Sequence, residues 1–149
     1  MSALRSLLAL VVVAVLAGCA AQGPLHKDVS ASIPAVPSGK GRVYFYRPDS
    51  MFGAAMTSDI TMNGRVVGRS VRGSFFYVDE NPGDCKASAS TEVERQVTFT
   101  LAPGETKYIK STVSIGALVG RVNLELVSPG DATKEIAELH YTGTPLSKN

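Results

Sequence analysis

The chain has 149 residues and a mass of 15.7 kDa, which is the size of one domain with a terminal tail. Hydrophobic residues make up 44% and charged residues 19% of it, a composition that excludes a disordered polyampholyte and a multi-span membrane protein. A formal charge of +2 gives no electrostatic reason to expect nucleic acid as a partner. With no Trp, two His and two Cys, the chain has few residues from which to build a catalytic or metal site.

The first nineteen residues predict export and a lipid anchor. Arg5 precedes an unbroken apolar run from Leu7 to Ala17, which is shorter than the roughly 20 helical residues that a membrane span needs. A charge followed by a short apolar run is the layout of a secretory signal peptide, here residues 1–18. The small residues before Cys19 resemble the bacterial lipoprotein box, which implies cleavage before that cysteine, a diacylglyceryl group on its sulfur and an acyl chain such as palmitate on the new amino terminus. The alternative, a plain secretory signal with a chance cysteine, stays open.

The residue after this cysteine bears on location. In Gram-negative cells an Asp at this position would indicate retention in the inner membrane, and the chain has Ala20 instead. We therefore expect a protein that its N-terminal lipid holds in the outer membrane, facing the periplasm. Two or more acyl chains make such an anchor effectively permanent, because each buried methylene contributes roughly 0.8 kcal/mol.

Residues 19–40 are predicted to form a flexible tether between the lipid and the folded domain. The segment contains three prolines and many small residues, and it has no hydrophobic period. His26 lies in this segment, and we expect its side chain to be solvated. If the lipid occupies Cys19, then Cys85 has no partner for a disulfide.

Residues 41–149 are predicted to form an all-β domain, an antiparallel β-sandwich of about eight short strands. Asn63-Gly64 is a strong hairpin signal, because both residues tolerate positive φ. A strand with Cys85, Ala87 and Ala89 on one face is expected to turn that small-residue face toward the core. The expected strands cover residues 42–47, 57–63, 65–70, 74–78, 85–90, 97–101, 109–115 and 122–126.

One segment near the C-terminus predicts a short helix, over residues 130–139. Ser128 is a capping residue, Pro129 follows at the first helical position, and an acid comes three residues after the cap. Ile136 and Leu139 then repeat at helical spacing. An edge strand is the alternative for this segment.

Several motifs, in their order and spacing, resemble one bacterial lipoprotein family. The chain is similar to the domain of unknown function 2846 over nearly all of residues 40–140, and its hairpin followed by a Pro-Gly strand start also resembles the PEGA-type β-sandwich domains. The resemblance implies a fold and a location, and it brings no established activity and no catalytic residues. The motifs are Gly41-Arg42-Val43-Tyr44-Phe45-Tyr46-Arg47-Pro48, Asn63-Gly64-Arg65-Val66-Val67-Gly68, Pro82-Gly83, Pro103-Gly104-Glu105-Thr106-Lys107-Tyr108, Ser114-Ile115-Gly116 and Gly120-Arg121.

Candidate catalytic residues are scarce. Cys85 with His140 as its base is one conceivable pair, but a thiol on a small-residue face behaves as a small hydrophobe, so we expect it in the core. His140 is expected to be a surface or capping group. No Cys and His spacing predicts zinc, no Asp-rich loop predicts calcium, and no glycine-rich loop predicts a phosphate site. We therefore expect no enzyme activity, no metal and no cofactor.

Two features suit recognition of a partner. Tyr44 and Tyr46 share one face of the first strand and Arg47 follows them, and Tyr and Arg are residue types favoured in binding surfaces. The alternative is that both faces of this strand are covered and the tyrosines are buried. The apolar segment 114–120 either contacts lipid or a partner, or forms a bulge or tight connection in the core.

We therefore expect a non-catalytic cell-envelope lipoprotein that acts as an interaction or structural module. The alternative is a binding module for a small molecule or a glycan, with peptidoglycan the nearest abundant candidate. The expected partners are the membrane, through the N-terminal lipid, and an envelope protein or peptidoglycan. The sequence indicates neither a particular partner nor the oligomeric state.

Overall fold

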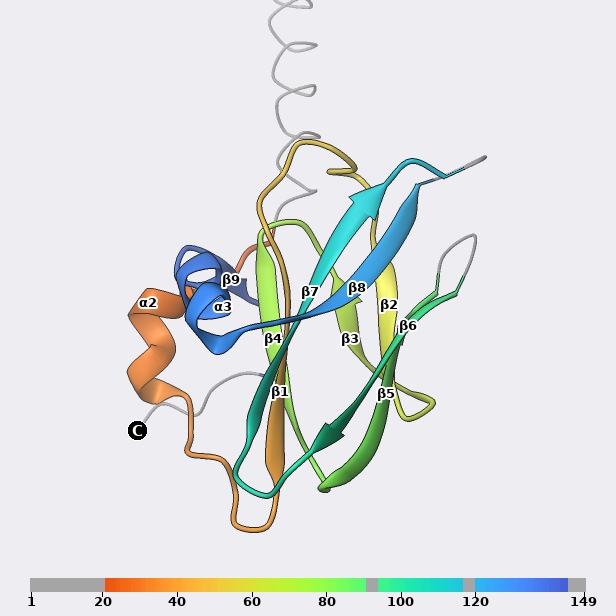
Figure 1. Ribbon diagram of the computed structural model, residues 1–149. Helices are drawn as coiled ribbons and strands as arrows, with labels where there is room; N and C mark the ends of the chain where they lie inside the picture. Colours follow the sequence, from red (N-terminus) through yellow and green to blue (C-terminus); the bar gives the residue numbers. More distant parts are fainter. Residues whose placement is uncertain (1–20, 91–93, 117–119, 145–149) are drawn as a thin grey trace, which may run out of the picture.

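The computed structural model describes residues 21–90, 94–116 and 120–144 and shows a β-sandwich with one short helix near the C-terminus (Figure 1). Cys19 and the predicted signal peptide lie outside the described residues. All eight predicted strands are present, and a two-residue strand, β9, adds to them. The strands are β1 (Gly41–Arg47), β2 (Ser58–Met62), β3 (Arg65–Ser70), β4 (Ser74–Glu80), β5 (Gly83–Ala89), β6 (Arg95–Leu101), β7 (Thr106–Ser114), β8 (Arg121–Val127) and β9 (His140–Tyr141).

The strands form two sheets that pack face to face, as the sequence predicts. The first sheet has the order β8-β7-β1-β4-β9 and the second the order β3-β2-β5-β6. β1 and β7 finish at one end of the sandwich, where β4 and β8 begin. This end is at the top of Figure 1, and we call it the upper end. The hairpin between β2 and β3 turns at Asn63 (φ 51°) and Gly64 (φ 80°), the positive angles that the Asn-Gly signal predicts.

Two strand pairs in the first sheet are parallel, which the prediction of an antiparallel sandwich missed. β7 pairs in parallel with β1, and β9 pairs in parallel with β4. The chain leaves β6 beside the start of β1, where Gly104 N–H donates to Lys40 O and Arg42 N–H donates to Glu105 O. β7 therefore starts at the same end as β1 and runs in the same direction.

The main core lies between the two sheets. Cys85, Ala87 and Ala89 are buried there, as their small-residue face predicts. They share this core with the larger side chains of the first sheet, including Phe45 and Phe76, whose rings stack with 5.2 Å between centroids. Small groups on one sheet thus accommodate aromatic groups on the other.

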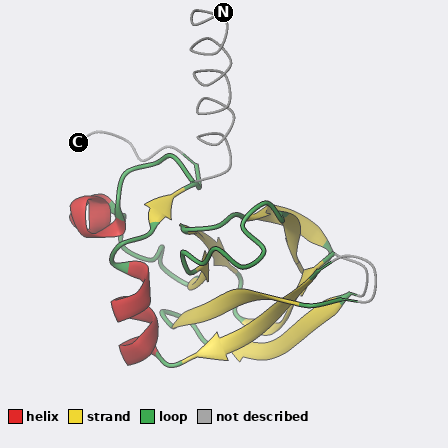
Figure 2. Ribbon diagram, turned by 90° about the horizontal axis from the view of Figure 1, so that it is seen from above, coloured by secondary structure: helices red, strands yellow, loops and turns green. Residues whose placement is uncertain are grey.

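A second core covers the outer face of the first sheet. The predicted helix is present as α3 (Pro129–Ile136), and Ser128 Oγ accepts a hydrogen bond from the backbone N–H of Asp131. Ala132 and Ile136 are buried against the sheet, and Leu139 follows them into the same cluster just before β9. Figure 2 shows the helices on one side of the sheets, so the fold has three layers.

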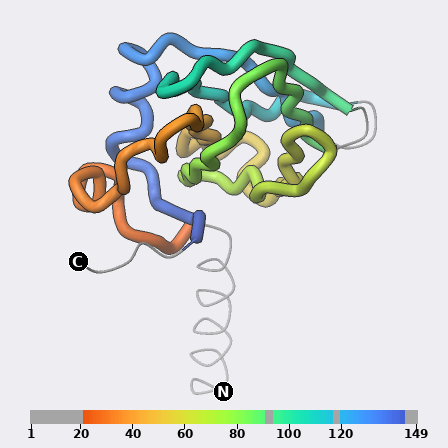
Figure 3. The backbone as a smooth tube through the Cα atoms, turned by 90° about the horizontal axis from the view of Figure 1, so that it is seen from below, coloured from red at the N-terminus to blue at the C-terminus, as the bar shows by residue number. Residues whose placement is uncertain are grey.

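Part of the predicted tether packs on the domain instead of standing free. Leu25 forms a bridge with His140 in β9, and α2 (His26–Val29) and the 3-10 turn η2 (Ser30–Ser32) follow. In Figure 3 this orange segment lies beside the blue C-terminal segment. The sequence did not reveal this packing because the partner groups are main-chain atoms near the other end of the chain. Among the described residues, no helix is both long enough and apolar enough to cross a membrane.

Candidate functional site

The structure buries the predicted partner-binding residues of β1. The exposed fractions of Tyr44 and Tyr46 are 8% and 2%, and Arg47 is buried as well. The tyrosines point to the outer face of the first sheet, which α3, Leu139 and the N-terminal segment cover. The expectation of an exposed Tyr44, Tyr46 and Arg47 surface is therefore corrected, because a third layer covers the face that carries the two rings.

Tyr46 belongs to a polar contact beneath α3. Its hydroxyl donates to Glu135 Oε2 at 2.8 Å, and Lys110 Nζ lies 2.8 Å from Glu135 Oε1. The ammonium of Lys110 and the hydroxyl of Tyr46 together lower the pKa of Glu135 below its usual value. This contact fixes α3 on the sheet through a carboxylate that stays charged.

Tyr44 lies in an aromatic layer under the same cover. Its ring stacks on Tyr108 at 5.2 Å and lies 5.5 Å from Tyr77. The guanidinium of Arg42 sits 4.2 Å from the Tyr77 ring centroid and binds Asp79 through two hydrogen bonds of 2.7 and 2.9 Å. The rings pack on one another and Arg42 is paired with Asp79, so this aromatic layer stabilises the fold.

Arg47 organises the loop that follows β1. Its two terminal nitrogens donate to the carbonyl oxygens of Met56 and Gly53, each at 2.6 Å. Burial, with Arg72 nearby, lowers the pKa of Arg47 below its usual value. The residue therefore acts inside the molecule, where it shapes the loop over residues 48–57.

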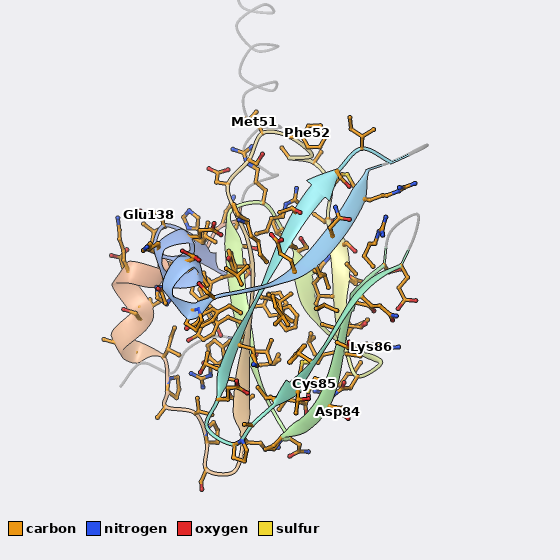
Figure 4. All side chains as sticks on the ribbon, viewed as in Figure 1. Met51, Phe52, Asp84, Cys85, Lys86 and Glu138 are labelled. Atoms are coloured by element: carbon orange, nitrogen blue, oxygen red, sulfur yellow. The ribbon has the colours of Figure 1, made fainter. Side chains whose placement is uncertain are left out.

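This loop carries two exposed large apolar side chains at the upper end. Met51 and Phe52 are 76% and 55% exposed, and Figure 4 shows both at the top of the molecule. Ile115, just after β7, is 81% exposed, so it does not belong to the core connection that was one alternative for segment 114–120. An open apolar hollow of about 330 Å³ lies between the two loops, lined by Phe52, Gly53, Met56, Val113, Ser114, Ile115, Gly116 and Gly120.

Sequence inspection missed Met51 and Phe52. The available signal was two adjacent large apolar residues between Pro48 and Gly53, in a segment otherwise typical of a turn. The neighbours of Phe52 in space include Thr112 and Val113 of β7, which the sequence does not place beside it.

Cys85 packs in the core, as predicted, and its thiol has no base beside it. Burial raises the pKa of the thiol, and Asn63 Nδ2 donates to Sγ at 4.0 Å. His140 lies in the first sheet and its Nδ1 bonds to Gly23 O, so the structure does not bring it to Cys85. An open hollow of about 540 Å³ borders Cys85 between β5 and β6, near the labelled Asp84 and Lys86 in Figure 4. No group of three metal-ligating residues occurs within the described part of the chain.

Comparison with known proteins places this three-layer sandwich in a family. Residues 37–122 match the family model described as protein of unknown function (DUF2846). The chain belongs to this family. A curated Haemophilus influenzae protein, described as uncharacterized, is 30% identical to this DUF2846 chain over 103 residues, which cover 68% of the chain and 61% of that protein. No solved structure matches the chain.

The family match confirms the resemblance stated for the motifs of β1, of the β2–β3 hairpin and of the β6–β7 turn. The expected similarity to PEGA-type domains is not among these matches. Because the chain spans about 61% of the length of the Haemophilus influenzae relative, part of that protein has no counterpart in the aligned region.

Proposed function

We propose that this DUF2846 chain is a non-catalytic lipoprotein of the bacterial cell envelope. It acts as an interaction or structural module that its N-terminal lipid holds at the periplasmic face of the outer membrane. The observation that carries the proposal is the sequence Leu16-Ala17-Gly18-Cys19, placed after a charged start and an apolar run too short to span a bilayer.

The chemistry of the described residues supports a non-catalytic module. The thiol of Cys85 is buried in the second sheet, whereas the imidazole of His140 lies in the first sheet and bonds to Gly23 O. The side chains around Tyr44 pack against one another in the outer core. Glycan binding, the alternative class, depended on an exposed aromatic pair on β1. Because Tyr44 and Tyr46 are buried, no observation favours glycan binding over the first proposal.

Replacing the acylated cysteine tests the anchor. Cys19→Ser is expected to release the protein from membranes or to leave an uncleaved precursor, because acylation goes through the sulfur. Cell fractionation, with mass spectrometry of the N-terminal peptide, measures both outcomes. Cys85→Ala is the matched control and is expected to stay membrane-bound. A processed Cys19→Ser protein that remains firmly in the membrane fraction would contradict the proposal.

The residue after the cysteine tests the membrane assignment. Ala20→Asp is expected to move the protein from the outer-membrane fraction to the inner-membrane fraction on a density gradient, with Ala20→Ser as the control that stays in place. Wild-type protein found in the inner membrane would contradict the outer-membrane part of the proposal.

A further inference from the structure

The upper end of the sandwich carries an apolar tip, which we define as Met51, Phe52 and Ile115. The described residues contain five exposed large hydrophobic side chains, and these three gather on two neighbouring loops. Figure 4 shows Met51 and Phe52 projecting from the loop above the strands. A cluster of this kind on a small domain indicates a contact surface, whereas single exposed apolar residues do not.

The structure holds the tip in place. Arg47 binds the carbonyl groups of Gly53 and Met56 from below, and Met56 N–H donates to Gly53 O at 2.9 Å. Gly53 has φ 67°, and a Cβ there would lie 2.6 Å from Val113 Cγ1, so the loop packs directly on β7. Phe52 is therefore exposed because the loop that carries it is held in one conformation, with the side chain of Phe52 directed to solvent.

The start of the described chain lies at the same end. Gly23 O bonds to His140 Nδ1, and His140 N–H donates to Gly73 O in the turn before β4. A Cβ at Gly73 would lie 3.7 Å from Cβ of Asp49, which belongs to the loop of the tip. A continuous set of contacts thus connects the N-terminal segment with this loop.

Covalent geometry then limits how far the lipid lies from the upper end. Ala20 alone separates Cys19 from Ala21, and two Cα–Cα steps span at most about 7 Å. Backbone hydrogen bonds hold the segment that follows. The N–H of Tyr141 donates to Pro24 O at 2.8 Å, and the N–H of His26 donates to Leu139 O at 2.9 Å. Acyl chains on Cys19 would therefore bring the bilayer close to the upper end.

The charges at this end suit phospholipid headgroups. Arg69 pairs with Asp59 and Arg72 pairs with Asp49. Arg121, at the start of β8, has no ion pair to any residue that the structure describes. The two ion pairs cancel in charge, so Arg121 supplies the one uncompensated positive charge among these five residues, and an anionic headgroup suits it.

We propose that the apolar tip is a membrane-contact surface, which inserts Met51, Phe52 and Ile115 into the headgroup region of the bilayer that holds the lipid anchor. This inference rests on the proposed acylation of Cys19. It adds an orientation, with the upper end on the membrane and the β2–β3 hairpin away from it. Aromatic and aliphatic side chains on a rigid loop are the usual groups for such an interface.

Tryptophan reporters test the orientation, because the chain has no natural Trp. Phe52→Trp and Ile115→Trp place a reporter on each loop of the tip, and Val66→Trp is the matched control, since Val66 is also exposed but lies next to the β2–β3 hairpin at the opposite end. The full-length, acylated proteins are reconstituted in vesicles of phosphatidylethanolamine and phosphatidylglycerol, with and without brominated acyl chains. Emission at residues 52 and 115 is expected to shift to shorter wavelength and to lose most of its intensity in brominated vesicles, while emission at residue 66 stays unchanged.

Other outcomes overturn the inference. Equal quenching at all three positions, or quenching at residue 66 alone, would mean that the tip does not face the bilayer. Shielding from water at residue 52 without quenching by bromine would assign the tip to a protein partner or a second copy of the chain. If mass spectrometry shows acylated Cys19 and the tip stays in water, the lipoprotein proposal survives without this orientation. If Cys19 carries no acyl chain, both proposals fail.

Discussion

At the scale of single residues, a few buried polar groups fix parts of the fold that hydrophobic packing alone would leave loose. Arg47 has no carboxylate partner among the described residues and binds main-chain oxygens of the loop over residues 48–57. Removing this buried cation leaves Met56 O without its Arg47 donor and leaves Gly53 O with only the N–H of Met56, and an unsatisfied buried carbonyl costs more than the net value of the hydrogen bond itself.

We expect Arg47→Met to lower the free energy of unfolding by about 3 kcal/mol, because both hydrogen bonds come from a charged donor. Denaturant titration measures this, and amide exchange at Ala54 and Met56 reports the loosening of the loop. Arg72→Met is the control, because its partner Asp49 is mostly exposed and such pairs contribute about 0–1 kcal/mol. Equal losses in the two variants would show that Arg47 does not shape the loop.

Cys85 provides a second test at this scale. Its burial and raised pKa keep the thiol protonated, so native Cys85 is expected to react slowly with a thiol reagent and quickly in denaturant. Cys85→Ala should fold with a loss of about 1 kcal/mol. Rapid labelling of the native protein would instead identify a reactive site beside the β5–β6 hollow.

At the scale of elements, the outer layer is the part with the least stability of its own. α3 has eight residues, too few for an independent helix, so it depends on its cap and on the sheet beneath it. Ser128 caps it, Tyr46 binds Glu135 from the sheet side, and Ala132 and Ile136 pack on the aromatic layer. The N-terminal segment then closes the edge by pairing with β9.

Ser128→Ala is expected to cost about 1 kcal/mol, the usual value of a lost N-cap, because the N–H of Asp131 loses its acceptor. Thr133→Ala, on the exposed side of the same helix, is the matched control and should change stability little. Thermal unfolding of both variants measures the difference. A cost for Ser128→Ala no greater than that of the control would mean that packing alone holds α3.

At the scale of the whole molecule, the third layer gives the protein a characteristic response to alkaline pH. Burial raises the pKa of Tyr44, Tyr46, Tyr108 and Tyr141, all on the outer face of the first sheet or in β9. A raised pKa in the folded state contributes stability that is complete below the unfolded value. That stability is lost as the pH rises toward the folded value.

We therefore expect the free energy of unfolding to fall steadily above about pH 10, the ordinary value for tyrosine. Denaturant midpoints across this range measure the slope. Tyr46→Phe is expected to be less stable at neutral pH, because it loses the bond to Glu135, but to have a shallower alkaline decline. An alkaline slope equal to that of the wild type would mean that Tyr46 is ionised equally easily in the folded and unfolded chains.

The sequence by itself determined the elements of this protein. The eight main strands, the Asn63-Gly64 turn, the start of α3 at Ser128 and the small-residue face of β5 all follow local rules. Side-chain alternation, turn conformation and helix capping act over a few residues, so their signals are present in short stretches of sequence. The prediction that Cys85 is buried succeeded for the same reason.

Only the tertiary structure decided which faces are covered and which ends meet. Alternation placed Tyr44 and Tyr46 on one face, but a layer supplied by α3, Leu139 and the N-terminal segment determined that this face is buried. The same holds for the pairing of β1 with β7, the docking of Leu25 on β9, and the meeting of the 48–57 loop with the end of β7. These contacts join residues far apart along the chain, and periodicity carries no information about which distant segment will supply the cover.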